Sequence, residues 1–155
     1  PFNKEMLYYA GKLALANGQK EKAEAFFKKA LEIDSSYMDA LMAYNKLLFS
    51  QDRYEESLEL LEQPLKEGEE DPFLLWDFAV SCQKVERYSD ALKAYQKAYS
   101  YLKNHEEFLQ DYGFFLMEEG IYKEAIEIFK QLNKMDPTNL DYIDVLERLE
   151  SGDYD

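Results

Sequence analysis

Histidine and cysteine, which often act as a general base, a nucleophile or a zinc ligand, are scarce in this sequence of 155 residues. His105 is its only histidine and Cys82 its only cysteine. Nucleophilic catalysis needs a nucleophile beside a base, and a zinc site needs three or four such ligands. Neither residue has a second His or Cys to work with, so we predict no catalytic site and no metal site. We expect His105 to be a solvated residue at a helix start and Cys82 to be a small buried apolar residue.

Acidic pairs are the remaining candidates for acid–base chemistry. Glu55-Glu56 and Glu118-Glu119 are neighbours in sequence, and neighbouring side chains on a helix point in different directions. There is also no glycine-rich phosphate loop and no G-x-S-x-G motif. The sequence therefore predicts a protein that is not an enzyme and has no cofactor. Its function must come from the elements that arrange its apolar and charged side chains for binding.

Those elements recur with a period of 34 residues, because Ala23, Ser57, Ala91 and Ala125 are evenly spaced and the chain around them aligns without a gap. The repeats are residues 4–37, 38–71, 72–105 and 106–139. In each, two apolar stripes with the i, i+3, i+4, i+7 spacing of a helix are separated by a turn. A fixed period of this length is typical of a solenoid, in which each unit buries its apolar face against its neighbours. We predict one all-α domain over residues 1–155, built from four helix pairs.

Local signals refine this prediction. Asp71 before Pro72 is an N-cap followed by a proline in the first helical turn, and Asn104 with Glu107 resembles a capping box. Pro64 lies within a second helix and should kink it or end it early. Small residues at 11, 79 and 113 should face those at 23, 57 and 91 and allow close backbone approach. Residues 140–150 predict one further helix with a polar outer face, which caps the stack.

Composition limits the partners. The net charge of −14 argues against binding to nucleic acid or to an anionic membrane surface. No apolar run approaches the roughly 18 residues of a membrane-spanning helix. The lone cysteine favours a reducing compartment, so we expect a cytoplasmic protein. Because the sequence begins at Pro1 rather than Met, we interpret it as a piece of a longer protein.

The chain resembles the tetratricopeptide repeat (TPR) family over residues 4–150. The residues that carry the resemblance best are Tyr122, Ala125, Phe129 and Asp136-Pro137, preceded by Tyr112-Gly113. The sequence departs from the family pattern at Lys20, Ser57, Pro64 and Lys103. The resemblance implies a right-handed superhelix of antiparallel helix pairs, without catalytic residues. It also implies that the first helices line a concave groove that commonly binds a peptide or a helix of another protein.

The groove implied by the family would be lined by residues that share one face of each first helix. Its aromatic and methionine content suits recognition of a helix in a groove. The alternative is that curvature of the stack, or the fifth helix, buries these side chains. The predicted groove residues are Tyr8, Lys12, Met42, Lys46, Phe49, Phe73, Trp76, Val80, Gln83, Gln110, Phe114 and Met117.

The sequence argues against one specialised function of the family. Some members hold the acidic C-terminus of heat-shock chaperones with a set of Lys, Asn and Arg side chains. The corresponding surface here has Tyr8, Lys12, Ala43, Phe73 and Asp77, which leaves one cation. A carboxylate ligand would meet the Asp77 side chain without enough compensating positive charge.

Three hypotheses for the function follow. The first is a protein-interaction module that binds an apolar or amphipathic segment in the groove. The second is a scaffolding segment of a longer repeat array that mediates self-association. The third is an acidic surface that attracts a basic partner, for which binding would weaken steeply with salt.

Overall fold

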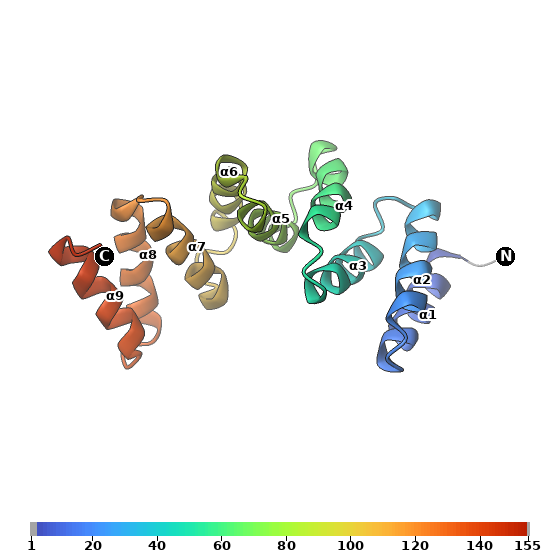
Figure 1. Cartoon of the computed structure of the whole chain (residues 1–155), viewed down its shortest axis with the longest axis horizontal. Coiled ribbons are helices and arrows are strands. Elements are labelled where there is room, and N and C mark those ends of the chain that lie inside the picture. The colour runs from blue at the N-terminus through green and yellow to red at the C-terminus, as the bar shows by residue number, and fades with distance from the viewer. Residues whose placement is uncertain (1–2, 155) are drawn as a thin grey trace. The chain divides into compact units, whose positions relative to one another are not determined.

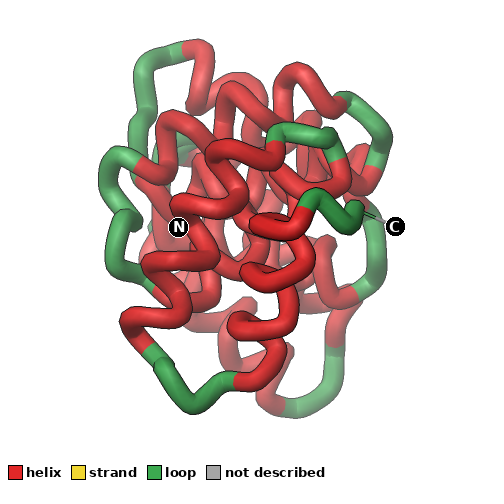
Figure 2. The backbone as a smooth tube through the Cα atoms, turned by 90° about the vertical axis from the view of Figure 1, so that its left-hand side faces the viewer, coloured by secondary structure: helices red, strands yellow, loops and turns green. Residues whose placement is uncertain are grey.

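The computed structural model describes residues 3–154, and this part of the chain forms nine α-helices and no strand (Figure 1). Short loops join the helices, as Figure 2 shows. The chain divides into two compact units, residues 1–94 and 95–155, with the boundary inside the sixth helix. The helices are α1 (Lys4–Ala16), α2 (Lys20–Ile33), α3 (Met38–Ser50), α4 (Tyr54–Lys66), α5 (Pro72–Lys84), α6 (Tyr88–Tyr99), α7 (Glu106–Glu118), α8 (Tyr122–Met135) and α9 (Leu140–Ser151).

Helix starts follow the period read from the sequence. The odd-numbered helices α1 to α7 begin at residues 4, 38, 72 and 106, and the even-numbered helices α2 to α8 begin at 20, 54, 88 and 122. Each predicted repeat therefore contains one helix pair, and α9 stands where the capping helix was expected. The prediction of an all-α fold of the solenoid class is confirmed.

Two local predictions need correction. Asp71 caps α5 as expected, because its carboxylate accepts hydrogen bonds from the backbone N–H groups of Phe73 and Leu74 at 2.9 and 3.1 Å. The capping box at Asn104 is wrong: His105 is the N-cap of α7, and its Nδ1 accepts from the backbone N–H of Phe108 at 3.2 Å. Pro64 does not end α4 early, because α4 continues to Lys66 and a proline in the last turns removes only one hydrogen bond of the helix. The alternative, that Pro64 kinks α4, stays a prediction.

Close packing within the first helix pair depends on Gly11. A Cβ atom at this position would lie 2.5 Å from Cε1 of Phe27, whose ring is fully buried. We predict that Gly11→Ala lowers the free energy of unfolding by about 1 kcal/mol, because overpacking outweighs the better helix propensity of alanine. Urea denaturation followed by circular dichroism measures the change. A variant more stable than the parent would contradict this packing.

The turn inside each helix pair places one residue in the left-handed region. Gly18 and Gly120 occupy it in the first and fourth pairs, whereas Asp52 and Glu86 occupy it with φ of 55° and 64°. A side chain with a Cβ atom is strained there, and glycine is not. We predict that Glu86→Gly raises the free energy of unfolding by about 0.5–1 kcal/mol. Asp52→Gly is the control for a smaller gain, since the Asp52 carboxylate accepts a hydrogen bond from the Tyr54 hydroxyl at 3.0 Å. Thermal unfolding of both variants tests whether Glu86→Gly gains more stability than Asp52→Gly.

Candidate partner-binding cleft

A cleft of about 470 Å³ opens in the first unit between α1, α3 and α5. Helical spacing creates its walls, because residues one or two turns apart lie on the same side of a helix. The cleft combines apolar side chains with two lysines and two aspartates. It is lined by Tyr8, Lys12, Asp39, Met42, Ala43, Lys46, Phe49 and Asp77, which include five of the predicted groove residues.

Aromatic contacts hold the walls of the cleft. The Tyr8 ring packs edge-on against Tyr37, with ring centroids 5.8 Å apart, and the ammonium group of Lys12 lies 5.9 Å from the centroid of Tyr8. At the other end, Phe49 packs edge-on against Tyr54 at 5.4 Å. These rings are therefore anchored to neighbouring residues and can present a fixed apolar surface.

A chain of buried polar groups leads to Asp77. The Asn45 amide donates to Oδ2 of Asp77 at 3.0 Å, and Oδ1 of Asn45 accepts from the Ser57 hydroxyl at 2.5 Å. The Ser57 oxygen lies 2.9 Å from that of Ser81, and because Ser57 uses its proton on Asn45, Ser81 is the donor of this contact. Asn45, Ser57 and Ser81 are fully buried. Each donor in this series of hydrogen bonds therefore points toward the Asp77 carboxylate.

The sequence analysis missed this chain, although one signal for it was present. Asn45 and Ser57 stand where the other repeats pair two small residues, as Gly11 does with Ala23. Ser57 was noticed as a departure from the family pattern, but its partner was not. Two polar residues at facing positions satisfy each other when buried, whereas one alone would leave an unpaired group.

Burial changes the acidity of the Asp77 carboxyl. Loss of solvent raises its pKa from 3.8 to about 6; the hydrogen bond from Asn45 opposes the change, and the charge of Asp71 adds to it. Among the residues described, no lysine or arginine forms an ion pair with Asp77. The cleft thus contains a carboxylate that is held by an amide and is not compensated by a cation.

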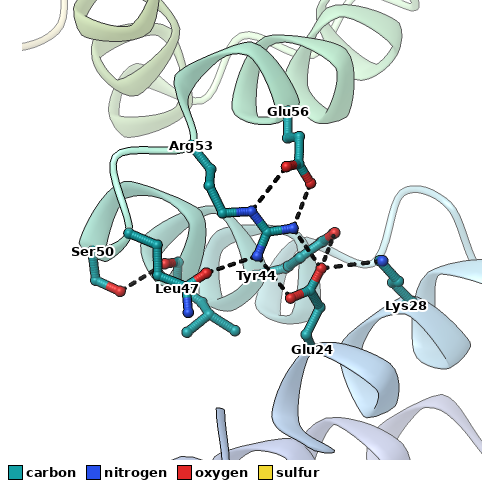
Figure 3. A network of polar contacts seen from close by, with 8 residues as sticks. Glu24, Lys28, Tyr44, Leu47, Ser50, Arg53 and Glu56 are labelled. Carbon is teal, nitrogen blue, oxygen red and sulfur yellow. Dashed lines mark hydrogen bonds and ion pairs between the residues drawn. The ribbon is translucent and has the colours of Figure 1, made fainter. Parts of the chain in front are cut away.

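An ionic network ties α3, which forms one wall of the cleft, to the helices before and after it (Figure 3). The Arg53 guanidinium donates to both oxygens of Glu24 at 2.8 Å, and also to Glu56 in the first turn of α4, which Arg53 precedes. Lys28 and the Tyr44 hydroxyl reach the same Glu24 carboxylate at 3.1 Å. These charges hold the pKa of Glu24 at about 2, chiefly through the hydrogen bonds from Arg53. The network connects α2 to α3 and to the start of α4.

The other predicted groove residues of the first unit do not line the cleft. Phe73 and Trp76 lie together on α5 with ring centroids 6.4 Å apart; Phe73 is exposed and Trp76 is half-buried. Val80 and Gln83 are half-buried on the same helix.

In the second unit, α9 reaches one predicted groove residue. The Gln110 amide hydrogen-bonds the hydroxyl of Tyr142, which itself donates to Glu106 at 2.8 Å. Phe114 is exposed and lies edge-on to Phe129 at 5.2 Å, and Met117 is half-buried. The C-terminal helix α9 therefore contacts the side chain of Gln110, whereas the ring of Phe114 remains exposed to solvent.

Reactive side chains do not gather into a metal site in the part of the chain that is described. Cys82 is fully buried, which raises the pKa of its thiol to about 12 and keeps it protonated. Within residues 3–154 no three His, Cys, Asp or Glu side chains are grouped as a metal site would require. No helix among these residues is both long and apolar enough to cross a bilayer.

The helix pairs repeat with one length, and a cleft lies between the first helices of three successive pairs. Together these features define a helical-repeat binding scaffold. The profile of a family described as "Anaphase-promoting complex, cyclosome, subunit 3" matches residues 16–98, and that of "YpiA-like, C-terminal tetratricopeptide repeats" matches residues 72–139. The chain belongs to the tetratricopeptide repeat family.

Related proteins agree with this assignment. The chain is 31% identical to a TPR repeat-containing protein, YpiA, of Bacillus subtilis (strain 168) over 96% of its own length and 35% of that protein. It is 28% identical to a TPR repeat-containing protein of Dictyostelium discoideum over 83% of its length and 54% of that protein. The chain thus spans about a third to a half of these relatives.

Solved structures share the fold. The structure of YrrB, described as a TPR protein with an unusual peptide-binding site, is 26% identical, with a TM-score of 0.82 over 94% of this chain and 75% of YrrB. A MamA structure superposes with a TM-score of 0.85 over 96% of this chain and 81% of that protein, at 15% identity.

Proposed function

We propose that this chain is a protein-interaction module whose cleft in the first unit binds an apolar or amphipathic peptide or helix of another protein. The observation that carries the proposal is the cleft itself, in which Tyr8, Met42 and Phe49 form an apolar surface next to charged side chains. An interface with an apolar centre and a polar rim is typical of peptide recognition. The likeness to YrrB, which is described as having a peptide-binding site, supports the same function.

Further contacts are proposed on the first helices outside the cleft. Phe73 with Trp76 in the first unit, and Phe114 with Met117 in the second, offer aromatic and methionine side chains of the kind that anchor partners. Nothing in this arrangement requires catalysis, a cofactor or a metal, and the acidic surface disfavours nucleic acid. We propose a reducing compartment such as the cytoplasm, because a single cysteine cannot form a disulfide within this sequence.

Selection from a displayed library of random peptides tests the proposal, with peptides of about 12 residues, or three helical turns. We expect the parent to enrich peptides with regularly spaced apolar residues. Met42→Ala/Phe49→Ala should lose them, whereas the control Ile33→Ala/Met135→Ala, which truncates exposed apolar residues outside the cleft, should retain them. Circular dichroism verifies that all three proteins are folded. No enrichment on the parent, or equal enrichment on the cleft variant, would exclude the proposal.

A second candidate function, self-association, is favoured by an apolar stripe on α1. Met6 and Leu13 are 52% and 65% exposed, although the equivalent residues of α3, Ala40 and Leu47, are almost fully buried. Tyr9 lies between them and is also exposed. The stripe has the character of an interface between repeats, and we propose that the α1 helix of a second copy covers it in a symmetric dimer.

Light scattering of the whole chain across a concentration series tests this second candidate. We expect a dimer that Leu13→Glu converts to a monomer without loss of helix content, because the new carboxylate would be buried without a partner. A parent chain that stays monomeric at the highest concentration would exclude the self-association.

A further inference from the structure

Asp77 differs from the other charged side chains of the cleft in its burial. Lys12, Lys46 and Asp39 are exposed, so water screens their interactions with a ligand. Asp77 has lost most of its solvent and gains one hydrogen bond in return, from Asn45. A bound segment would remove the remaining water from this carboxylate. The bound segment must therefore supply the positive charge that the chain itself does not place against the Asp77 carboxylate.

The buried polar chain fixes how Asp77 is presented. Because Oδ1 of Asn45 accepts from Ser57, its amide nitrogen is the group that faces Asp77, and it engages Oδ2. Donors that all point the same way polarise one another and stabilise a negative charge at the end of the chain. A rotated Asn45 would place an oxygen against the carboxylate, which the contact with Ser57 prevents.

The surroundings of the carboxylate suit the stem of a long cationic side chain. Met42, Ala43 and Phe49 line the same cleft, and the methylene groups of lysine or arginine pack well on such surfaces while the charged end reaches an anion. The charged groups around Asp77 are Asp71 at the N-cap of α5, Asp39 and Lys46 on α3, and Lys12 on α1. The exposed lysines remain available for acidic residues elsewhere in the same segment.

We propose that the cleft is selective for a peptide segment that carries a lysine or arginine between apolar residues, and that this cation pairs with Asp77. The inference rests on the proposed function, since it concerns the occupant of the same cleft. A carboxylate-bearing segment is the opposite possibility, and it would be repelled by Asp77. Binding should weaken as the pH falls through the range in which Asp77 takes up a proton.

The test uses the same peptide library on the parent chain and on two matched variants. Asp77→Asn keeps the shape and can still accept the Asn45 hydrogen bond, and Asp39→Asn removes an exposed charge of the same cleft. We expect peptides selected on the parent to share one basic position flanked by apolar residues. Their affinity should fall about tenfold or more with Asp77→Asn, and less than about threefold with Asp39→Asn.

A pH series on the parent provides a second measurement that does not depend on a variant. Peptides without His, Asp or Glu should bind more weakly at pH 5 than at pH 7.5, and Asp77→Asn should abolish this dependence. Selected peptides that lack a basic position, that carry an acidic residue in place of the basic one, or that bind Asp77→Asn equally would overturn the inference while leaving the proposed function intact. Failure to select any peptide on the parent would instead overturn the proposed function, and the inference with it.

Discussion

Arg53→Met is expected to lower the free energy of unfolding by about 2 kcal/mol at pH 7. The substitution keeps the length of the side chain and removes the charge that pairs with Glu24 and Glu56. Glu24 is only 15% exposed and would lose its strongest partner, which is costly for a carboxylate with little solvent. Urea denaturation gives the change, because the slope and midpoint of the transition yield the free energy.

Arg87→Met is the matched control for this prediction. Arg87 pairs with Glu62 and Asp90 in the same way, but its side chain is 42% exposed, so the pairs are screened by water. We expect a loss below about 1 kcal/mol. Equal losses for the two variants would show that the network of Figure 3 has no special role.

The pH dependence of the Arg53 effect has a definite sign. The pKa of Glu24 is about 2 in the folded chain and near 4.5 without its partners. The stabilisation is therefore present above pH 4.5 and is lost as the pH falls toward 2. The difference between the parent and Arg53→Met should close over that range. A shift of this size corresponds to roughly 3 kcal/mol, which solvent screening reduces to the value expected above.

The helix pairs could be predicted from the sequence because their signal is repeated. Four copies of one pattern fix the register even where a single copy departs from it, as at Ser57 or Pro64. The cleft residues Tyr8, Lys12 and Met42 followed from the family resemblance and from helical spacing, which together place side chains on a common face. That these residues bind a partner stays a prediction.

Contacts between different helices could not be predicted in the same way. Asp77, Asn45 and Ser57 belong to three helices, and nothing in the local pattern shows that their side chains meet. The salt bridge from Glu24 to Arg53 likewise joins residues of different repeats. The error at the start of α7 has a different origin: an unprotonated imidazole nitrogen can accept a hydrogen bond, so His105 takes the role that was given to Asn104.

Asp77→Asn is expected to stabilise the folded chain at pH 7 by about 1–2 kcal/mol, although it should weaken binding. Because burial raises the pKa of Asp77 from 3.8 to about 6, the ionised form is disfavoured in the folded state. The stability supplied by the protonated form is fully present below pH 3.8 and is lost as the pH rises through 6. The full shift corresponds to roughly 3 kcal/mol, and the part of the carboxylate that still meets solvent reduces it.

Thermal unfolding of the parent and Asp77→Asn at pH 7 and pH 4 measures the effect. The variant should be the more stable protein at pH 7, and the two should converge at pH 4, where the parent has taken up its proton. Asp39→Asn, which alters an exposed carboxylate, should show neither effect. A destabilised Asp77→Asn would mean that the charge supports the fold rather than opposing it. A variant that gains stability and loses peptide affinity would instead identify Asp77 as a charge that the fold tolerates and a ligand compensates, as expected where function and stability conflict.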